Sequence, residues 1–186
     1  MVRGETKVDD VHVALLRGIN VGGKNRLPMK DLVAMFLDDG CLQVRTYIQS
    51  GNVVFRAPPA RVLRIPAAIA KALSARFGFS VPVVTRTAAE IRAIARGNPF
   101  LRTGADTKSL HVAFLAGWPS PASVAKLDPA RSPPDEIVLR GREIYLRLPN
   151  GVARSKFTNA YFDGKLGTTS TVRNWATVLA LVELLG

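Results

Sequence analysis

The sequence is short of the residues that build metal centres, disulfide scaffolds and membrane spans. Its 186 residues include one cysteine, Cys41, and two histidines, His12 and His111. A single cysteine excludes an internal disulfide framework and a thiolate zinc site. No apolar run approaches the roughly 20 residues that a bilayer-spanning helix needs, and residues 1–10 carry acidic side chains instead of an apolar leader. We therefore expect no metal, no cofactor, no membrane contact and a cytoplasmic location.

Acidic residues are also scarce, and their scarcity is uneven. The chain has 26 Lys and Arg against 14 Asp and Glu, a net charge of +12. Residues 57–105 contain a single acidic side chain and carry a net +7, whereas residues 1–56 carry +2 and residues 106–186 carry +3. A positive field of this kind attracts phosphates and polyanions. It makes nucleic acid a possible partner, although solvated helix surfaces rich in arginine account for the same charge.

Hydrophobic periodicity predicts the order β-α-β-β-α-β in the first half, which is the split β-α-β or ferredoxin-like plan. The predicted strands are residues 11–16, 43–48, a return strand beginning at 53, and 81–84, and the predicted helices are 28–39 and 65–77. Pro82 places the last of these strands at a sheet edge, because proline cannot donate to a strand ladder.

The second half repeats this plan. Residues 110–117 align with residues 11–18 at a constant offset of 99, and five of the eight positions are identical, including both histidines. We predict an α+β fold of two duplicated ferredoxin-like plaits with antiparallel sheets, in which residues 1–103 form the first repeat with a connector helix over 88–96. Residues 104–186 form the second, with strands 136–140 and 143–148 and helices 120–127, 156–162 and 172–185.

A glycine-rich loop follows the first predicted strand. Residues 18–25 read Gly-Ile-Asn-Val-Gly-Gly-Lys-Asn and fit the G-x-x-x-x-G-K part of a phosphate-binding loop. Asn25 stands where that loop carries the Ser or Thr that binds magnesium, and an antiparallel plait lacks the parallel β-α-β unit of nucleoside triphosphatases. These differences exclude that enzyme class. A glycine turn with a lysine still suits a phosphate or carboxylate.

The predicted topology brings this loop to the edge of the sheet where the turn at residues 49–52 lies. The two segments contribute amides, a hydroxyl and cations but no carboxylate, a set that suits an anion or a base edge and contains no general base. The candidate ligand-binding residues here are Arg17, Gly18, Asn20, Gly22, Gly23, Lys24, Asn25, Gln49, Ser50 and Asn52. The alternative is a flexible connection with solvated basic tips.

Two further candidates lie near the C-terminus. Ser155 and Lys156 could form a nucleophile beside a base, but a serine that caps a helix gives the same pattern. Arg173, Asn174 and Trp175 offer a bidentate cation, an amide and an aromatic face that could hold a nucleotide. The alternative for this triplet is a tryptophan that anchors the last helix in the core.

Several of these segments resemble the bacterial DUF1697 family. The resemblance is carried by residues 15–24, 27–29 and 47–55 and by the shorter motifs at 98–100, 155–156 and 171–175. The chain has Ala176 where the family's motif carries a second asparagine. The resemblance implies a compact bacterial α+β protein and gives no reaction, since the family has no established activity.

The residues favour a binding protein for a phosphorylated or nucleotide-like ligand, with nucleic acid as one form of that ligand. One alternative is an enzyme that acts on a small phosphorylated metabolite through Arg17, Lys24 or the pair Ser155 and Lys156. The other is a protein-interaction module without a small ligand. The sequence leaves the oligomeric state undefined.

Overall fold

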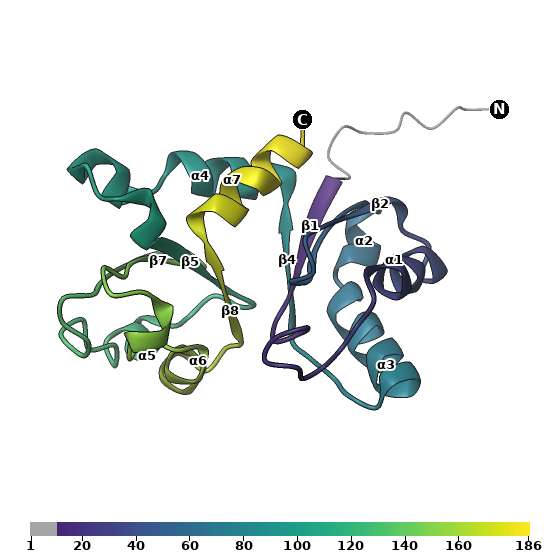
Figure 1. The fold of residues 1–186 in the computed structure, drawn as a ribbon, viewed down its shortest axis with the longest axis horizontal. Helices are drawn as coiled ribbons and strands as arrows, with labels where there is room; N and C mark the ends of the chain where they lie inside the picture. The colour runs from purple at the N-terminus through teal and green to yellow at the C-terminus, as the bar shows by residue number, and fades with distance from the viewer. Residues whose placement is uncertain (1–10) are drawn as a thin grey trace. The chain divides into compact units, whose positions relative to one another are not determined.

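The computed structural model describes residues 11–186, which form a mixed α/β protein with two four-stranded antiparallel sheets and seven α-helices (Figure 1). The described chain divides into two compact units, one of residues 11–91 with 184–186 and the other of residues 92–183. The predicted absence of a leader segment concerns residues 1–10, which lie outside the described residues. Within residues 11–186, every helix is too short or too polar to cross a bilayer.

The first unit holds its elements in the predicted order, with one additional helical turn. Its strands are β1 (Val11–Leu16), β2 (Leu42–Tyr47), β3 (Asn52–Arg56) and β4 (Val83–Thr87), and its helices are α1 (Met29–Asp38), the turn α2 (Pro59–Val62) and α3 (Ile65–Phe77). The strands pair antiparallel in the order β2-β3-β1-β4. Helix α4 (Ala88–Arg96) follows β4 directly.

Helices α1 and α3 lie together on one side of this sheet (Figure 1). Each helix buries residues three or four positions apart, which places them on one face. The buried residues are Leu32, Met35 and Phe36 of α1 and Ile65, Ile69 and Leu73 of α3. They pack against Ala14, Leu16, Val53 and Phe55 of the sheet in one continuous core. This core fixes the ends of β1 and β3, from which the glycine loop and the turn at 49–52 leave.

Strand β4 begins two residues later than the sequence pattern predicts, at Val83 instead of Val81. Pro82 is the cause, because it has no N–H to give to the ladder. Its carbonyl oxygen accepts a hydrogen bond from the backbone N–H of Arg17 at 3.0 Å. The strand is at the edge of the sheet, as its proline predicts.

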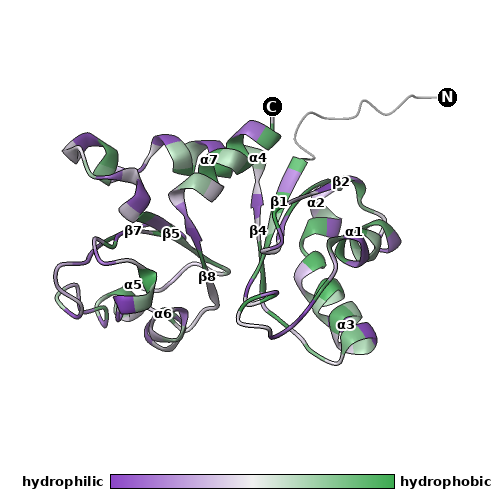
Figure 2. Ribbon diagram, in the orientation of Figure 1, coloured by the Kyte–Doolittle hydropathy of each residue, from purple (hydrophilic) through white to green (hydrophobic). Residues whose placement is uncertain are grey.

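The second unit contains a sheet with strand order β6-β7-β5-β8. Its strands are β5 (Leu110–Leu115), β6 (Glu136–Arg140), β7 (Glu143–Arg147) and β8 (Ser170–Asn174), and its helices are α5 (Pro121–Val124), α6 (Asn159–Leu166) and α7 (Trp175–Leu184). Short 3-10 turns are η1 (Pro99–Thr103), η2 (Thr107–Ser109) and η3 (Val152–Arg154). Helix α7 is coloured apolar over most of its length (Figure 2), which is typical of a helix buried on more than one side.

The predicted helix at 172–185 is wrong over its first residues. Ser170–Asn174 is a strand that pairs with β5, and the helix begins only at Trp175. The side-chain oxygen of Asn174 accepts a hydrogen bond from the N–H of Thr177 at 2.8 Å, which caps the helix at this point. The predicted helix at 156–162 likewise begins later, at Asn159.

The two histidines occupy matching places in the two sheets. His12 lies opposite Phe55 on one side and Thr87 on the other. His111 lies opposite Leu146 and Asn174. In both units the residue across from the histidine on the last strand directly precedes a helix.

Burial lowers the pKa of His111 below its ordinary value, an effect that exceeds the opposing influence of the Ser109 carbonyl oxygen 3.2 Å from Nδ1. The unfolded chain therefore binds a proton more readily than the folded one as the pH falls below about 6.5. We expect the stability that neutral His111 provides to be complete above that pH and to be lost as the pH falls through the folded pKa. Urea unfolding between pH 7.5 and pH 5 should show a shallower loss in His111→Gln than in the wild type; equal slopes would contradict this assignment.

Candidate functional site

The glycine loop between β1 and α1 closes on itself through its own backbone. The N–H of Asn20 donates to the carbonyl oxygen of Asn25 at 3.1 Å, and the N–H of Lys24 donates to that of Val21 at 3.1 Å. The side-chain amide of Asn25 donates to the carbonyl oxygen of Gly18 at 2.9 Å. Both asparagines have positive φ, of 53° and 49°, a conformation that asparagine tolerates better than most residues. The loop is a defined turn.

The side chain of Asn20 joins this loop to the turn at 49–52. Its amide nitrogen donates to the carbonyl oxygen of Leu27 at 2.9 Å and to that of Gln49 at 3.0 Å, and its oxygen accepts from the N–H of Leu27 at 2.8 Å. The sequence predicts that these two segments lie close together, and the contact to Gln49 places them so. Because both N–H groups of this amide donate to backbone carbonyl oxygens, neither is left to bind a ligand. The role of Asn20 is to hold the loop in place.

Asn52 stabilises the turn at 49–52 through the hydrogen bonds of its side chain. It is fully buried, and its amide nitrogen donates to the carbonyl oxygen of Tyr47 at 3.2 Å and to Oγ of Ser50 at 2.8 Å. Gly51, which lies between Ser50 and Asn52, has a φ of +75°, and its carbonyl oxygen accepts a hydrogen bond from the N–H of Leu16 at 2.8 Å. The polar groups that the sequence nominates in this turn are therefore largely used to shape it.

Other members of the predicted loop site remain open to solvent. Lys24 and Gln49 are exposed, and their side chains form no hydrogen bond or ion pair with the described residues. A side-chain carbon at Gly18, Gly22 or Gly23 would meet no atom within 4 Å. Arg17 is half-buried at the end of β1. The loop thus presents an exposed lysine, and its glycines have open space beside them.

The Ser155 and Lys156 pair is not arranged as a nucleophile and base. Ser155 is buried, and its Oγ accepts a hydrogen bond from the N–H of Phe157 at 3.1 Å. Lys156 is exposed, and in residues 11–186 no hydrogen bond joins the two side chains. The helix-cap alternative also fails, because Thr158 is the residue whose oxygen caps α6, accepting from the N–H of Tyr161 at 3.2 Å.

The Arg173, Asn174 and Trp175 triplet divides between two environments. Arg173 is buried in β8, where Nη1 donates to Oγ1 of Thr171 at 2.8 Å and to the carbonyl oxygen of Val172 at 3.0 Å. Burial lowers the pKa of Arg173 to about 10. Asn174 and Trp175 both line a pocket at the beginning of α7. Trp175 is also a core residue that is only 2% exposed, as expected for a tryptophan that anchors the last helix.

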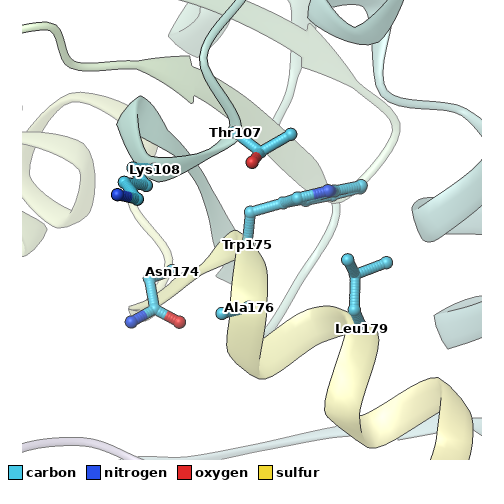
Figure 3. A pocket seen from close by; sticks show the side chains of 6 residues that line it. All are labelled: Thr107, Lys108, Asn174, Trp175, Ala176 and Leu179. Atoms are coloured by element: carbon cyan, nitrogen blue, oxygen red, sulfur yellow. The ribbon is translucent and has the colours of Figure 1, made fainter.

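We call this the α7 pocket. Its volume is about 270 Å³, and it is lined by Thr107, Lys108, Asn174, Trp175, Ala176 and Leu179. Figure 3 shows the indole of Trp175 extending across the pocket, with Lys108 and Asn174 toward one side and Leu179 toward the other. The pocket therefore combines an aromatic ring with an ammonium, an amide and a hydroxyl group.

The sequence pattern did not single out three of the residues that line the pocket, which are Thr107, Lys108 and Leu179. Turn η2 leads directly into β5, and β5 pairs with β8 so that His111 lies opposite Asn174. This pairing carries Lys108 to the start of α7. The repeated strand motif at residue 110 predicts where β5 begins and therefore that Lys108 lies just before it. It does not predict that β5 pairs with the strand that leads into α7, and so it does not place Lys108 beside Trp175.

Two further kinds of chemistry can be checked in residues 11–186: metal binding and thiol reactivity. Within the described part of the chain, no three potential metal ligands come together. Cys41 is buried, and burial together with the charge of Asp39 raises the pKa of its thiol to about 11. The thiol is protonated at neutral pH, so Cys41 is a core residue.

Fold and site together define a two-unit α+β protein with a small pocket lined by aromatic, cationic and polar side chains. The chain belongs to the DUF1697 family, described as a protein of unknown function, whose sequence model matches residues 10–145. That range includes the glycine loop and the turn at 49–52, and it ends before α7.

A solved structure of the conserved bacterial protein SP0830 from Streptococcus pneumoniae is similar, with a TM-score of 0.67 and 19% sequence identity. The match covers 95% of this chain and 99% of that one, so the likeness extends to the whole fold. No curated protein sequence matches the chain.

Proposed function

We propose that this protein binds a small ligand that combines a planar ring with a phosphate group, such as a nucleotide, in the α7 pocket. The observation that carries the proposal is the convergence of the Trp175 ring with Lys108, Asn174 and Thr107 around one cavity of about 270 Å³. Trp175 is only 2% exposed, so the ring of the ligand would contact just the part of the indole that lines the pocket. The ammonium can attract a phosphate. Amide and hydroxyl groups then fix the orientation of the ligand.

The size and lining of the pocket narrow the proposal. A volume of 270 Å³ lies near the lower end of the range for ligand pockets, which suits a mononucleotide better than a dinucleotide. The lining contains no carboxylate, imidazole or thiol, the groups that most often act as general acid or base. Binding is therefore better supported than the enzyme alternative.

Tryptophan fluorescence can test this proposal directly. The chain has two tryptophans, and Trp118 is 76% exposed and outside the pocket, so Trp118→Phe leaves Trp175 as the sole tryptophan. We expect nucleoside 5′-monophosphates to quench its emission and Lys108→Ala to weaken that binding about 10-fold, because a charge-assisted contact is lost. Lys126→Ala, which removes an exposed lysine elsewhere in the same unit, should leave the affinity unchanged. No quenching at millimolar nucleotide, or equal effects of the two lysine variants, would reject the proposal.

The glycine loop is a second candidate location for a phosphate. The exposed Lys24 and the open backbone at Gly22 and Gly23 favour it. An anion held there would depend on Lys24 and not on Lys108, so isothermal titration of the nucleotide against Lys24→Ala and Lys108→Ala separates the two locations.

We also propose that the chain is a duplication of one ferredoxin-like plait, with repeats over residues 1–103 and 104–186. Two features support this. Both sheets place their strands in the order second, third, first, fourth. In addition, the buried arginines Arg86 and Arg173 lie opposite Val13 and Val112, which correspond in the sequence repeat.

A further inference from the structure

A second recess, in the first unit, is lined mainly by cationic and small side chains. We call it the basic recess. It has a volume of about 450 Å³ and lies over α2 and the beginning of α3. Its lining comprises Arg61, Leu63, Arg64, Ala67, Ala68 and Lys71, with Asp39 at its margin. The lining contains no aromatic ring, so the basic recess offers charge without a stacking surface.

The cations of the basic recess exceed its anions by two. The carboxylate of Asp39 lies 3.8 Å from Nη1 of Arg61, and the same nitrogen donates to the carbonyl oxygen of Asp39. Arg64 and Lys71 are exposed and form no ion pair with the described residues. Three cations around one recess repel one another, and a bound anion relieves that repulsion.

Arg61 is held in place by the shape of the neighbouring chain. Gly40 has a φ of +80°, and a side-chain carbon there would lie 2.9 Å from Nη1 of Arg61. The absence of that carbon lets the guanidinium group lie against the end of α1. One of the three cations is therefore fixed before a ligand arrives, which lowers the entropy lost on binding.

The beginning of α3 departs from the pattern that stabilises a helix. Arg64 occupies the capping position and makes no capping hydrogen bond, and the first turn has no acidic residue. Acidic or small polar residues are preferred at that end, because the helix dipole makes it positive. A cation at the positive end of a helix lowers the stability of that helix. Residues that lower stability in this way are characteristic of binding sites.

We infer that the basic recess binds a compact anion that carries two or more adjacent phosphate groups. Its volume of about 450 Å³ exceeds what a single phosphate fills, and its three cations can contact the oxygens of more than one phosphate group. This inference is independent of the α7 pocket, because the two share no residue and belong to different units.

Isothermal titration with inorganic tripolyphosphate tests the inference, with orthophosphate as the comparison that has a single phosphate group. We expect one tripolyphosphate per chain at the basic recess, bound at least 10-fold more tightly than orthophosphate. Arg64→Ala and Lys71→Ala should each weaken tripolyphosphate binding about 10-fold. Arg26→Ala and Lys30→Ala remove the same two charges from exposed positions outside the basic recess in the same unit, and each should change the affinity less than 2-fold.

Three outcomes would overturn the inference. One is the absence of tripolyphosphate binding at low salt. Another is an equal loss of affinity in Arg26→Ala and Lys30→Ala, which would show that only the overall field attracts the anion. The third is tighter binding of a 20-nucleotide single strand than of tripolyphosphate, with a steep salt dependence that falls in Arg64→Ala, since this would assign the recess to a nucleic-acid backbone. Circular dichroism of Arg64→Ala verifies that α3 is intact.

Discussion

Replacing Gly51 by alanine is expected to lower the free energy of unfolding by about 3–4 kcal/mol. The backbone at this residue has a φ of +75°, where a residue with a side chain costs about 1–2 kcal/mol more than glycine. The new carbon would also lie 2.7 Å from Cβ of Leu16 and 3.0 Å from Cδ1 of Ile19. Cβ of Leu16 is attached to the central strand β1 and cannot move aside, so the overpacking adds about 1–3 kcal/mol.

Gly23 supplies a matched control, because its φ is also +75° and a side-chain carbon there would meet nothing within 4 Å. Gly23→Ala should lose only the conformational part, about 1–2 kcal/mol. Urea unfolding of the two variants measures the difference, which isolates the close approach of the turn to β1. If both variants lose the same amount, the contact with Leu16 is not what requires glycine at position 51.

Replacing Asn20 by alanine is expected to cost about 3 kcal/mol. Three hydrogen bonds disappear, each of which contributes about 1 kcal/mol. The N–H of Leu27, a residue that is only 2% exposed, also loses its partner. The amide proton of Leu27 should therefore exchange with solvent faster in the variant, which nuclear magnetic resonance can follow together with urea unfolding.

Asn25→Ala serves as the comparison for Asn20→Ala. Asn25 lies in the same loop with a similar φ of 49°, but its side chain makes one hydrogen bond, to Gly18. We expect a loss of about 1–2 kcal/mol. Equal losses in the two variants would mean that the link from Asn20 to residues 27 and 49 does not hold the loop.

The predictable part of the fold is the part with strong periodicity. The alternating residues at 136–140 and the helical spacing at 65–77 give the bounds that the structure has. The strand at 170–174 was not predictable in the same way, because it is short, leads directly into an apolar helix, and depends on its pairing with β5. Tertiary contacts override local pattern at such positions.

The site was predictable to a smaller extent. Topology correctly brings Asn20 to Gln49, since the loop after the first strand and the hairpin between the second and third strands leave the same edge of the sheet. The partners of that amide are backbone carbonyl groups, however, whose positions follow from the course of the chain and not from residue type. The same limit applies to Lys108, which reaches Trp175 only through the pairing of two strands distant in sequence.

The burial of Cys41 makes it an internal probe of local opening. The chain has no other thiol, and this one is protonated and shielded in the folded state. A thiol reagent can therefore react only when the segment between α1 and β2 opens, and the labelling rate measures how often it does so. Because that segment includes Asp39, which lines the basic recess, the rate also reports whether an occupant of the recess holds the segment closed.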